Sequence, residues 1–125
     1  MNIPQDLRYT REHEWVRLEG DIATIGITDY AQGELGDIVF VEVETVGDEL
    51  AVGEVFGTME AVKTVNDLFS PLAGEVTAFN EGLEDDPEAV NNDPYGNGWI
   101  VRIKLSNPSD FEGLLTAEEY SDLIR

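Results

Sequence analysis

The sequence predicts a mainly β fold, in which two small sheets pack face to face and short helices follow at the C-terminus. Short apolar or alternating stretches such as 22–27 and 38–43 recur along the chain, separated by turns rich in Gly, Asp and Asn. Residues 53–55 and 74–76 both read Gly-Glu-Val, a weak internal repeat that suggests two quasi-symmetric sheets. A length of 125 residues favours one compact domain with a modest core.

The N-terminal part predicts a hairpin. Residues 15–18 (Trp-Val-Arg-Leu) alternate as in a strand, residues 22–27 form a second strand, and Glu-Gly-Asp between them is typical of a turn. His13 is the only histidine and has a glutamate on each side. Because no second histidine and no cysteine exists to complete a metal site, we expect His13 to be exposed or hydrogen-bonded.

A short helix and a strand follow this hairpin. Thr28 is a good N-cap, and Gly33 or Gly36 would end the helix that it starts. Residues 38–43 (Ile-Val-Phe-Val-Glu-Val) then form a strand. Its nearly continuous apolar character predicts burial on both faces.

Residues 54–76 are the stretch around which the chain is organised. They read as two short strands that meet at a tight turn, with Lys63 at or next to the tip. The chain has only two lysines, Lys63 and Lys104, against 27 acidic residues. A modifying enzyme can reach a lysine at an exposed turn from several sides, so Lys63 is a candidate attachment point for a prosthetic group. The alternative is an ordinary solvated lysine, the commonest state of a lone lysine.

The strands and the loop after the hairpin complete the predicted sheets. Residues 74–80 form a strand, and Gly74 at its start permits a bulge or a close approach of two backbones. Residues 81–98 are rich in Asp, Asn, Pro and Gly and predict a long loop with one helical turn at 87–90. Residues 99–105 alternate into a last strand.

Two short helices are predicted at the C-terminus, over 107–115 and 116–124. Ser109 and Thr116 are plausible caps for them. Thr116 with Glu119 three residues later has the spacing of a capping box.

The net charge of −20 argues against nucleic acid and anionic membranes as partners, because binding to either requires lysine and arginine. The acids are spread along the whole chain, which favours adaptation to a salty cytoplasm over a local docking patch.

Several classes of protein are disfavoured by what the sequence lacks. With no cysteine it forms no disulfides and has no thiolate chemistry. It has no apolar run of bilayer-spanning length, and its N-terminus resembles neither a signal peptide nor a transit peptide. A self-contained enzyme is disfavoured because we find no nucleophile–base pairing and no glycine-rich phosphate loop. A cytoplasmic protein is the simplest interpretation.

The lysine hairpin resembles that of the glycine cleavage system H protein family. Residues 60–64 (Glu-Ala-Val-Lys-Thr) are similar to the core of the family's lysine motif. Asp67 and residues 70–76 (Ser-Pro-Leu-Ala-Gly-Glu-Val) follow it as they do in the family. The chain departs from the family pattern at Thr64, where the family usually has alanine.

The resemblance extends over nearly all of the chain, roughly residues 7–123. Its longest and most specific part is 25–42, Ile-Gly-Ile-Thr-Asp-x-Ala-Gln-x-x-Leu-Gly-Asp-Ile-Val-Phe-Val-Glu. Residues 10–16 resemble the family's N-terminal signature, and residues 94–100 (Pro-Tyr-x-x-Gly-Trp-Ile) also match. At 43–47 the family's proline is missing while its glycine is kept, which puts only the conformation of that loop in doubt.

This resemblance implies a barrel-sandwich hybrid of the lipoyl- and biotinyl-carrier type. It implies a single carrier domain over 1–125, with a core at about 7–105 and C-terminal helices at about 108–124, acting as a non-catalytic monomer. Lipoate would be joined as an amide to Lys63 by lipoate-attaching enzymes. The carrier would take the aminomethyl group of glycine from a pyridoxal-phosphate decarboxylase to a tetrahydrofolate-dependent aminomethyltransferase, and an FAD-dependent dihydrolipoyl dehydrogenase would reoxidise it.

The resemblance also implies a cleft that shelters the arm, near Glu14, Leu35, Gly36 and Asp67. A carboxylate there would hold a cationic amine. The alternative for Glu14 and Asp67 is a plain surface acid, the commonest state of acids in so acidic a chain.

Two other carrier classes share this fold. Biotin carriers place methionines on both sides of the lysine, whereas Val62 and Thr64 flank Lys63 here. A lipoyl module of a 2-oxoacid dehydrogenase usually has Asp-Lys-Ala and a linker to a catalytic core, and we find neither. A lipoyl donor to other complexes would have the same sequence features as a member of the cleavage system, and neighbouring genes would separate the two.

Overall fold

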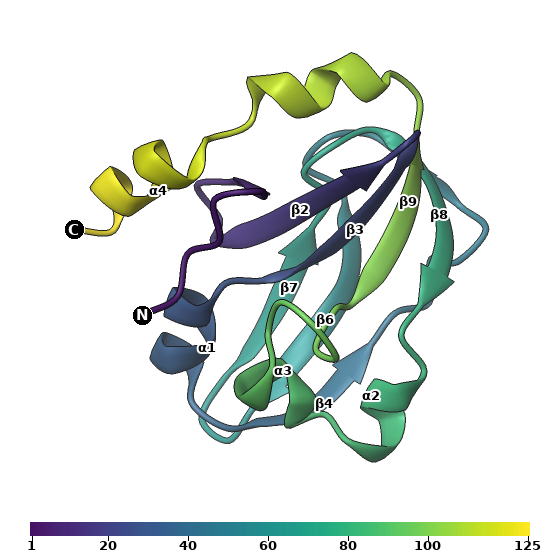
Figure 1. Ribbon diagram of the computed structural model, residues 1–125. Coiled ribbons are helices and arrows are strands. Elements are labelled where there is room, and N and C mark those ends of the chain that lie inside the picture. The colour runs from purple at the N-terminus through teal and green to yellow at the C-terminus, as the bar shows by residue number, and fades with distance from the viewer.

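The computed structural model describes residues 1–125 as two antiparallel sheets flanked by short helices (Figure 1). The larger sheet has six strands in the order β1-β2-β3-β9-β8-β5, and the smaller sheet has three in the order β4-β6-β7. The predicted mainly β sandwich is therefore confirmed, although its two sheets are unequal in size. The strands are β1 (Arg8–Tyr9), β2 (Glu14–Glu19), β3 (Ile22–Ile27), β4 (Ile38–Glu42), β5 (Glu49–Leu50), β6 (Val55–Ala61), β7 (Val65–Phe69), β8 (Gly74–Phe79) and β9 (Val101–Leu105). The helices are α1 (Asp29–Leu35), α2 (Gly82–Asp85), α3 (Ala89–Asn92), the 3₁₀ helix η1 (Pro108–Gly113) and α4 (Ala117–Leu123).

One apolar core of 21 buried residues joins the two sheets. Val16, Ile25 and Val101 lie at paired positions across β2, β3 and β9, and all three are fully buried. From the smaller sheet, Val41 and Met59 form a buried pair across β4 and β6. Phe40 and Glu60, which neighbour Val41 and Met59, face solvent, whereas Trp15 and Thr24, which neighbour Val16 and Ile25, are also buried.

The prediction that the strand at 38–43 is buried on both faces is wrong. Ile38 and Val41 are buried, but Val39 and Phe40 are 48% and 47% exposed. The strand, β4, is an edge strand of the smaller sheet, and its register shifts between Ile38 and Phe40. A half-exposed edge strand with a bulge can also contain a continuous apolar run. The composition of β4 therefore did not determine whether the strand is buried.

The segment 81–98 contains two short helices, α2 and α3, where the sequence predicts a single turn at 87–90. Leu83 of α2 and Val90 of α3 are buried and anchor the segment to the core. The last strand, β9, is shorter than predicted, since it begins at Val101 and not at Trp99.

The C-terminal helices differ in type. The Thr116 hydroxyl accepts a hydrogen bond from the Glu119 N–H at 3.2 Å, and Glu119 Oε1 accepts one from the Thr116 N–H at 2.9 Å, so the predicted capping box is confirmed. The helix that precedes α4 is the 3₁₀ helix η1. The prediction that Ser109 caps this helix is wrong. The Ser109 hydroxyl instead donates to Asn107 Oδ1 at 2.8 Å.

A second apolar cluster holds α4 against the start of the larger sheet (Figure 1). Tyr9, Trp15 and Tyr120 are fully buried in it. The rings of Tyr9 and Tyr120 stack with their centroids 4.8 Å apart. Residues close to the two termini are thereby packed together.

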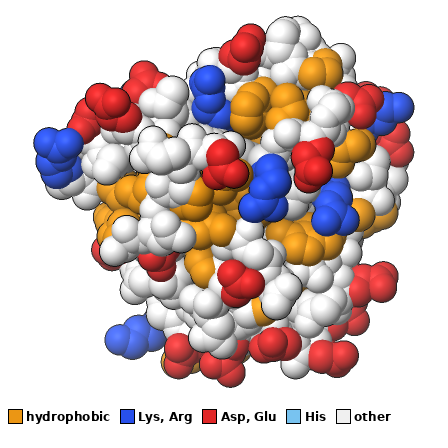
Figure 2. All heavy atoms as spheres, in the orientation of Figure 1, with side chains coloured by type: hydrophobic (Ala, Val, Ile, Leu, Met, Phe, Trp, Pro, Cys, Tyr) orange, Lys and Arg blue, Asp and Glu red, His pale blue; other side chains and the backbone are white.

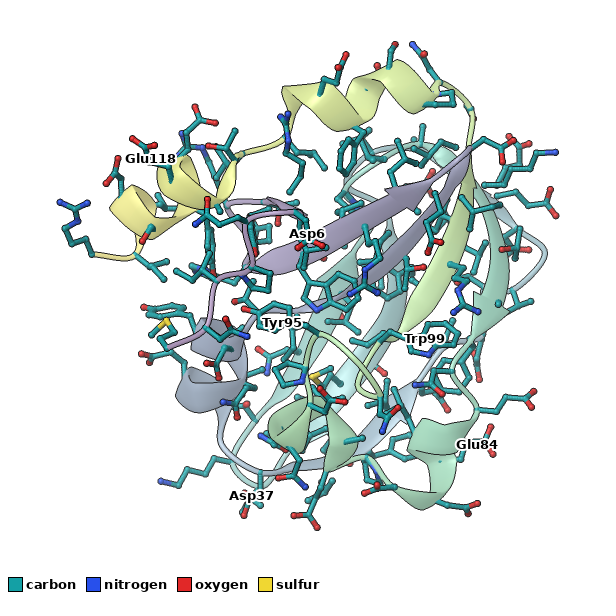
Figure 3. The ribbon with its side chains drawn as sticks, in the orientation of Figure 1. Asp6, Asp37, Glu84, Tyr95, Trp99 and Glu118 are labelled. Atoms are coloured by element: carbon teal, nitrogen blue, oxygen red, sulfur yellow. The ribbon has the colours of Figure 1, made fainter.

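Acidic side chains outnumber Lys and Arg on the face drawn in Figure 2 and lie mainly toward its edges. Asp37, Glu84 and Glu118 illustrate this in Figure 3. The structure contains a single ion pair, between Arg125 and Asp122. None of the other acids is paired with a basic side chain, and all of them except the buried Glu14 are in contact with solvent. None of the helices combines the length and the apolar character needed to cross a bilayer.

Gly74 begins β8 where that strand comes very close to β9. A Cβ built at this position would lie 2.2 Å from the carbonyl oxygen of Lys104 and 2.7 Å from Cγ2 of Ile103. This is the close backbone approach that the sequence predicts for Gly74, and only glycine permits it.

We expect Gly74→Ala to lower the free energy of unfolding by about 2 kcal/mol or more, because the new methyl group must push a strand backbone aside. Gly33→Ala in α1 is the matched control, since no atom lies within 4 Å of a Cβ built there. That change should raise the free energy of unfolding by about 0.5–1 kcal/mol. Urea unfolding of both variants measures the difference, and an undiminished stability of Gly74→Ala would contradict the close approach.

Candidate functional site

Lys63 lies at the exposed turn between β6 and β7. The Ala61 N–H donates to the Thr64 carbonyl at 2.8 Å, and the Val62 N–H donates to the Asp37 carbonyl at 3.1 Å. These bonds tie the turn to itself and to the segment before β4. The Lys63 ammonium forms no hydrogen bond and no ion pair with the chain, so its amine is free to react.

Exposed apolar side chains surround this turn. Val62 is 69% exposed and Val65 is 66% exposed, while Val39 and Phe40 of β4 face solvent on the same sheet. Glu60 of β6 pairs with Phe40 of β4 on one side and with Val65 of β7 on the other. With Val39 and Val62, these two apolar residues form an apolar strip around the turn, which the exposed Glu60 interrupts.

A cavity of about 570 Å³, called the main cavity below, begins beside this turn. One wall is β7, from Val65 to Phe69, and the opposite wall is α1. The segment that leads into β2 closes its far end. The lining residues are Glu12, His13, Glu14, Ile27, Tyr30, Ala31, Glu34, Leu35, Val65, Asn66, Asp67, Leu68 and Phe69.

The structure brings three of the four predicted cleft residues together. Glu14, Leu35 and Asp67 line the main cavity, from β2, α1 and β7 respectively. Gly36 is not among its lining residues. Gly36 caps α1 with φ 77°, and its N–H donates to the Gln32 carbonyl at 3.0 Å.

Local sequence explains how α1 is placed. At its start the Thr28 hydroxyl accepts from the Ala31 N–H at 3.2 Å, as predicted for an N-cap. At its end Gly36, one of the two predicted stops, takes the left-handed conformation.

Asn91 of α3 fixes the C-terminal end of α1 to the beginning of β4. Its Nδ2 donates to the Gly36 carbonyl at 2.8 Å and to Gln32 Oε1 at 3.1 Å. Its Oδ1 accepts from the Ile38 N–H at 2.9 Å. A single side chain thus holds the end of one wall of the main cavity.

Glu14 is the one carboxyl group that the fold buries, with 3% of the residue exposed. Desolvation raises its pKa from 4.5 to about 8. Hydrogen bonds from the Thr10 hydroxyl, 3.1 Å away, and from the backbone of Phe69 act in the opposite direction, and the charge of Glu12 adds to the increase. Burial therefore favours the protonated form of the Glu14 carboxyl.

Asp67 provides a second carboxyl group in a different environment. It lies on β7 opposite Thr58, and its side chain is exposed at the rim of the main cavity. The site therefore combines a buried carboxyl group with a solvated one.

Sequence reasoning missed two aromatic parts of the lining, Tyr30 and the ring of His13. Their ring centroids lie 4.9 Å apart. His13 is hydrogen-bonded through Nδ1 to the Tyr120 hydroxyl at 2.9 Å, which confirms one of the two expectations for it. Tyr30 precedes Glu34, another lining residue, by four positions on α1, and that spacing was the available signal that the two share a face of the helix.

A second, smaller cavity of about 320 Å³ adjoins the main cavity. The two cavities share Glu12, Glu14 and Phe69 in their linings. Leu114 and Leu115, which follow η1, close the second cavity on its outer side. Glu14 therefore lies between the two cavities and lines both of them.

The raised pKa of Glu14 predicts how stability depends on pH. Below pH 4.5 the carboxyl is protonated in both the folded and the unfolded state. Between pH 4.5 and about 8 the unfolded chain loses this proton and the folded chain keeps it. The free energy of unfolding should therefore fall as pH rises through this window, by up to about 1.4 kcal/mol per pH unit, and level off above it.

Urea unfolding of the protein and of Glu14→Gln across this window isolates the effect, because the other acids contribute equally to both. We expect the stability of Glu14→Gln relative to the unchanged chain to increase from pH 5 to pH 8 and then to stay constant. A difference that does not vary with pH would show that Glu14 titrates normally.

Comparison with known proteins identifies the family. A sequence profile of the glycine cleavage H-protein matches residues 7–125. The chain is similar to two proteins named glycine cleavage system H protein, with 60% identity to that of Bacteroides thetaiotaomicron and 58% to that of Bacteroides fragilis. Each match spans 124 residues, 99% of this chain and 98% of the relative.

A solved structure agrees with these sequence matches. The crystal structure of a glycine cleavage system H protein from Mycobacterium marinum superposes with a TM-score of 0.86 at 39% identity. The superposition covers 96% of this chain and 97% of that one. Both the sequence over nearly its whole length and the fold therefore place this chain in the glycine cleavage system H protein family.

Proposed function

We propose that Lys63 carries lipoate as an amide and that the main cavity receives the free end of the arm. The observation that carries this proposal is the position of the lysine. Lys63 is exposed, its ammonium has no partner, and the main cavity begins at Val65, two residues further along the chain. An arm attached at this turn has both free space around it and a hollow within reach.

The reaction in which the chain takes part follows from its family. Members of the H protein family are non-catalytic lipoyl carriers of the glycine cleavage system, so this chain carries lipoate on a lysine and works with the decarboxylase, the aminomethyltransferase and the dihydrolipoyl dehydrogenase of that system. Of its two lysines, Lys63 lies in a turn and Lys104 lies within β9, paired with Ile22 and Glu75. A flexible turn suits an attaching enzyme better than the middle of a sheet.

The residues of the main cavity fit such an arm. When bound, lipoate supplies a disulfide–dithiol pair that takes up and releases the aminomethyl group and is then reoxidised. Seven of the thirteen lining residues are apolar, which suits an aliphatic chain and a sulfur ring. Glu14 and Asp67 suit a cationic amine at the end of the arm. A volume of about 570 Å³ lies within the usual range of small-ligand sites.

Glu14 has a defined part in holding the amine. An approaching ammonium favours the charged form of the carboxyl, so Glu14 releases its proton to solvent as the ammonium enters and then forms an ion pair with it. Asp67 at the rim meets the same amine while it is still solvated. The walls formed by Leu35 and Phe69 exclude water from the space between them, which protects a group that hydrolyses readily.

The apolar strip around the turn suits docking by the partner enzymes. Val39, Phe40, Val62 and Val65 surround the attachment point, so an enzyme that covers them also encloses the base of the arm. Once a partner is docked, the tether makes each transfer effectively intramolecular.

We also propose that the chain acts as one carrier domain, as a monomer in the cytoplasm, and that lipoate-attaching enzymes load it. A net charge of −20 disfavours association of identical copies. The absence of cysteine is compatible with a reducing compartment.

We expect intact mass and peptide mapping of protein from its native host to find one lipoyl amide on the peptide that contains Lys63. Lys63→Arg should remove this mass entirely, because arginine has no acylable primary amine. Lys104→Arg is the matched control and should keep it, since it removes the only other lysine. Protein from a host with lipoate synthesis disabled should lack the modification.

Three outcomes would change the assignment. An unmodified Lys63 in the native host would overturn the attachment site. Lipoyl mass on Lys104 would move it to β9. A biotin mass on the Lys63 peptide would assign the chain to the biotin carriers instead.

A further inference from the structure

His13 has an unusual backbone conformation at the end of the β1–β2 turn. Its φ of 66° makes it the only residue other than glycine with a positive φ. The turn is closed by the His13 N–H, which donates to the Thr10 carbonyl at 3.1 Å. Glycine or asparagine usually occupies a left-handed position of this kind in a hairpin loop, because a Cβ is disfavoured there. A histidine at this position therefore needs a reason that lies in its side chain.

The side chain of His13 reaches the C-terminal helix. Its Nδ1 lies 2.9 Å from the hydroxyl of Tyr120, a fully buried residue of α4. The same hydroxyl lies 2.7 Å from the Thr28 hydroxyl, which is also fully buried. Tyr120 thus joins two residues that are 107 and 92 positions away in the sequence.

Thr28 and His13 are also joined directly, because the Thr28 N–H donates to the His13 carbonyl at 3.1 Å. Thr28 is the N-cap of α1, one wall of the main cavity. His13 immediately precedes Glu14, and both residues line the main cavity. The triangle formed by His13, Thr28 and Tyr120 therefore connects two walls of the main cavity at the point where they meet.

The hydrogen bonds of this triangle are satisfied whether His13 is neutral or charged. With a neutral ring, the Tyr120 hydroxyl donates to Nδ1 and accepts from the Thr28 hydroxyl. With a protonated ring, Nδ1–H donates to Tyr120, which donates to Thr28 in turn. The link between the walls therefore does not depend on which form the ring takes.

We propose that Tyr120 is a positioning residue of the main cavity: through His13 and Thr28 its hydroxyl sets the spacing between Glu14 and α1. The C-terminal helix, which does not line the main cavity, would then determine the geometry in which Glu14 is buried. This inference rests on the proposed function only in taking the lipoyl arm as what the main cavity receives. The predicted change in the Glu14 titration can be measured in protein without lipoate.

The chain contains a matched control for the Tyr120 hydroxyl. Tyr9 is equally buried and stacks on Tyr120 in the same apolar cluster. Its hydroxyl donates to the Pro4 carbonyl at 2.6 Å, away from the main cavity. Tyr9→Phe and Tyr120→Phe therefore delete the same group from neighbouring sites, but only the second deletion breaks the triangle.

The readout is the titration of the Glu14 carboxyl, followed by ¹³C NMR in lipoate-free protein. The titratable or charged groups around Glu14 in the two cavities are Tyr9, Arg11, Glu12, His13, Tyr30, Glu34 and Asp67, and Tyr120→Phe leaves all of them in place. We expect Tyr120→Phe to lower the midpoint of Glu14 by about one pH unit or more, because the loosened turn lets water reach the carboxyl. Tyr9→Phe should leave it unchanged.

His13→Gly tests the link from the other end. If His13 served only the turn, glycine would suit the left-handed position better, stability would rise and Glu14 would titrate as before. If it transmits the effect of Tyr120, glycine should lower the Glu14 midpoint as Tyr120→Phe does, even though the backbone strain is relieved. This variant also gives the answer should Tyr120→Phe fail to fold.

Two results would overturn the inference. One is an unchanged Glu14 midpoint in folded Tyr120→Phe or in His13→Gly. The other is an equal shift in Tyr9→Phe, which would indicate general loosening of the apolar cluster. Neither result depends on whether Lys63 is lipoylated, so a failure here is distinguishable from a failure of the proposed attachment site.

Discussion

The cross-strand register of β6 and β7 is the constraint on which the carrier site depends. Buried Met59 pairs with Asn66, and Glu60 pairs with Val65 on the exposed side. A slip of one residue would turn the charged side chain of Glu60 toward the core and Met59 toward solvent, so the apolar core fixes the pairing. With this register fixed, Lys63 has to fall in the turn, and Asp67 at the rim of the main cavity.

Local patterns in the sequence predicted the parts of the fold that local chemistry determines. The Thr28 cap, the Thr116 capping box and the exposed position of Lys63 each depend on a few neighbouring residues, and the structure has all three. The burial of β4 was predicted wrongly because it depends on which strand lies beside it, and Val39 and Phe40 carry no local sign of an open edge.

The candidate site was predictable only in part, for the same reason. Family resemblance pointed to Glu14, but composition gave no sign that this one acid among 27 is buried. Its burial results from four segments that meet in space: the β1–β2 turn, α1, β7 and the residues after η1. The ring of His13 and the hydroxyl of Tyr120 are brought together across 107 positions, a contact that no single-sequence pattern encodes.

The anchoring of α1 has a consequence for the order of events during synthesis. The helix is held at its end by Asn91 and at its start by Tyr120, and both anchors follow it by more than fifty positions. On a growing chain the β6–β7 hairpin, a local structure, can form soon after it leaves the ribosome. The wall opposite it gains its second anchor only when α4 has been translated. Nascent chains therefore expose Lys63 before the main cavity beside it is complete.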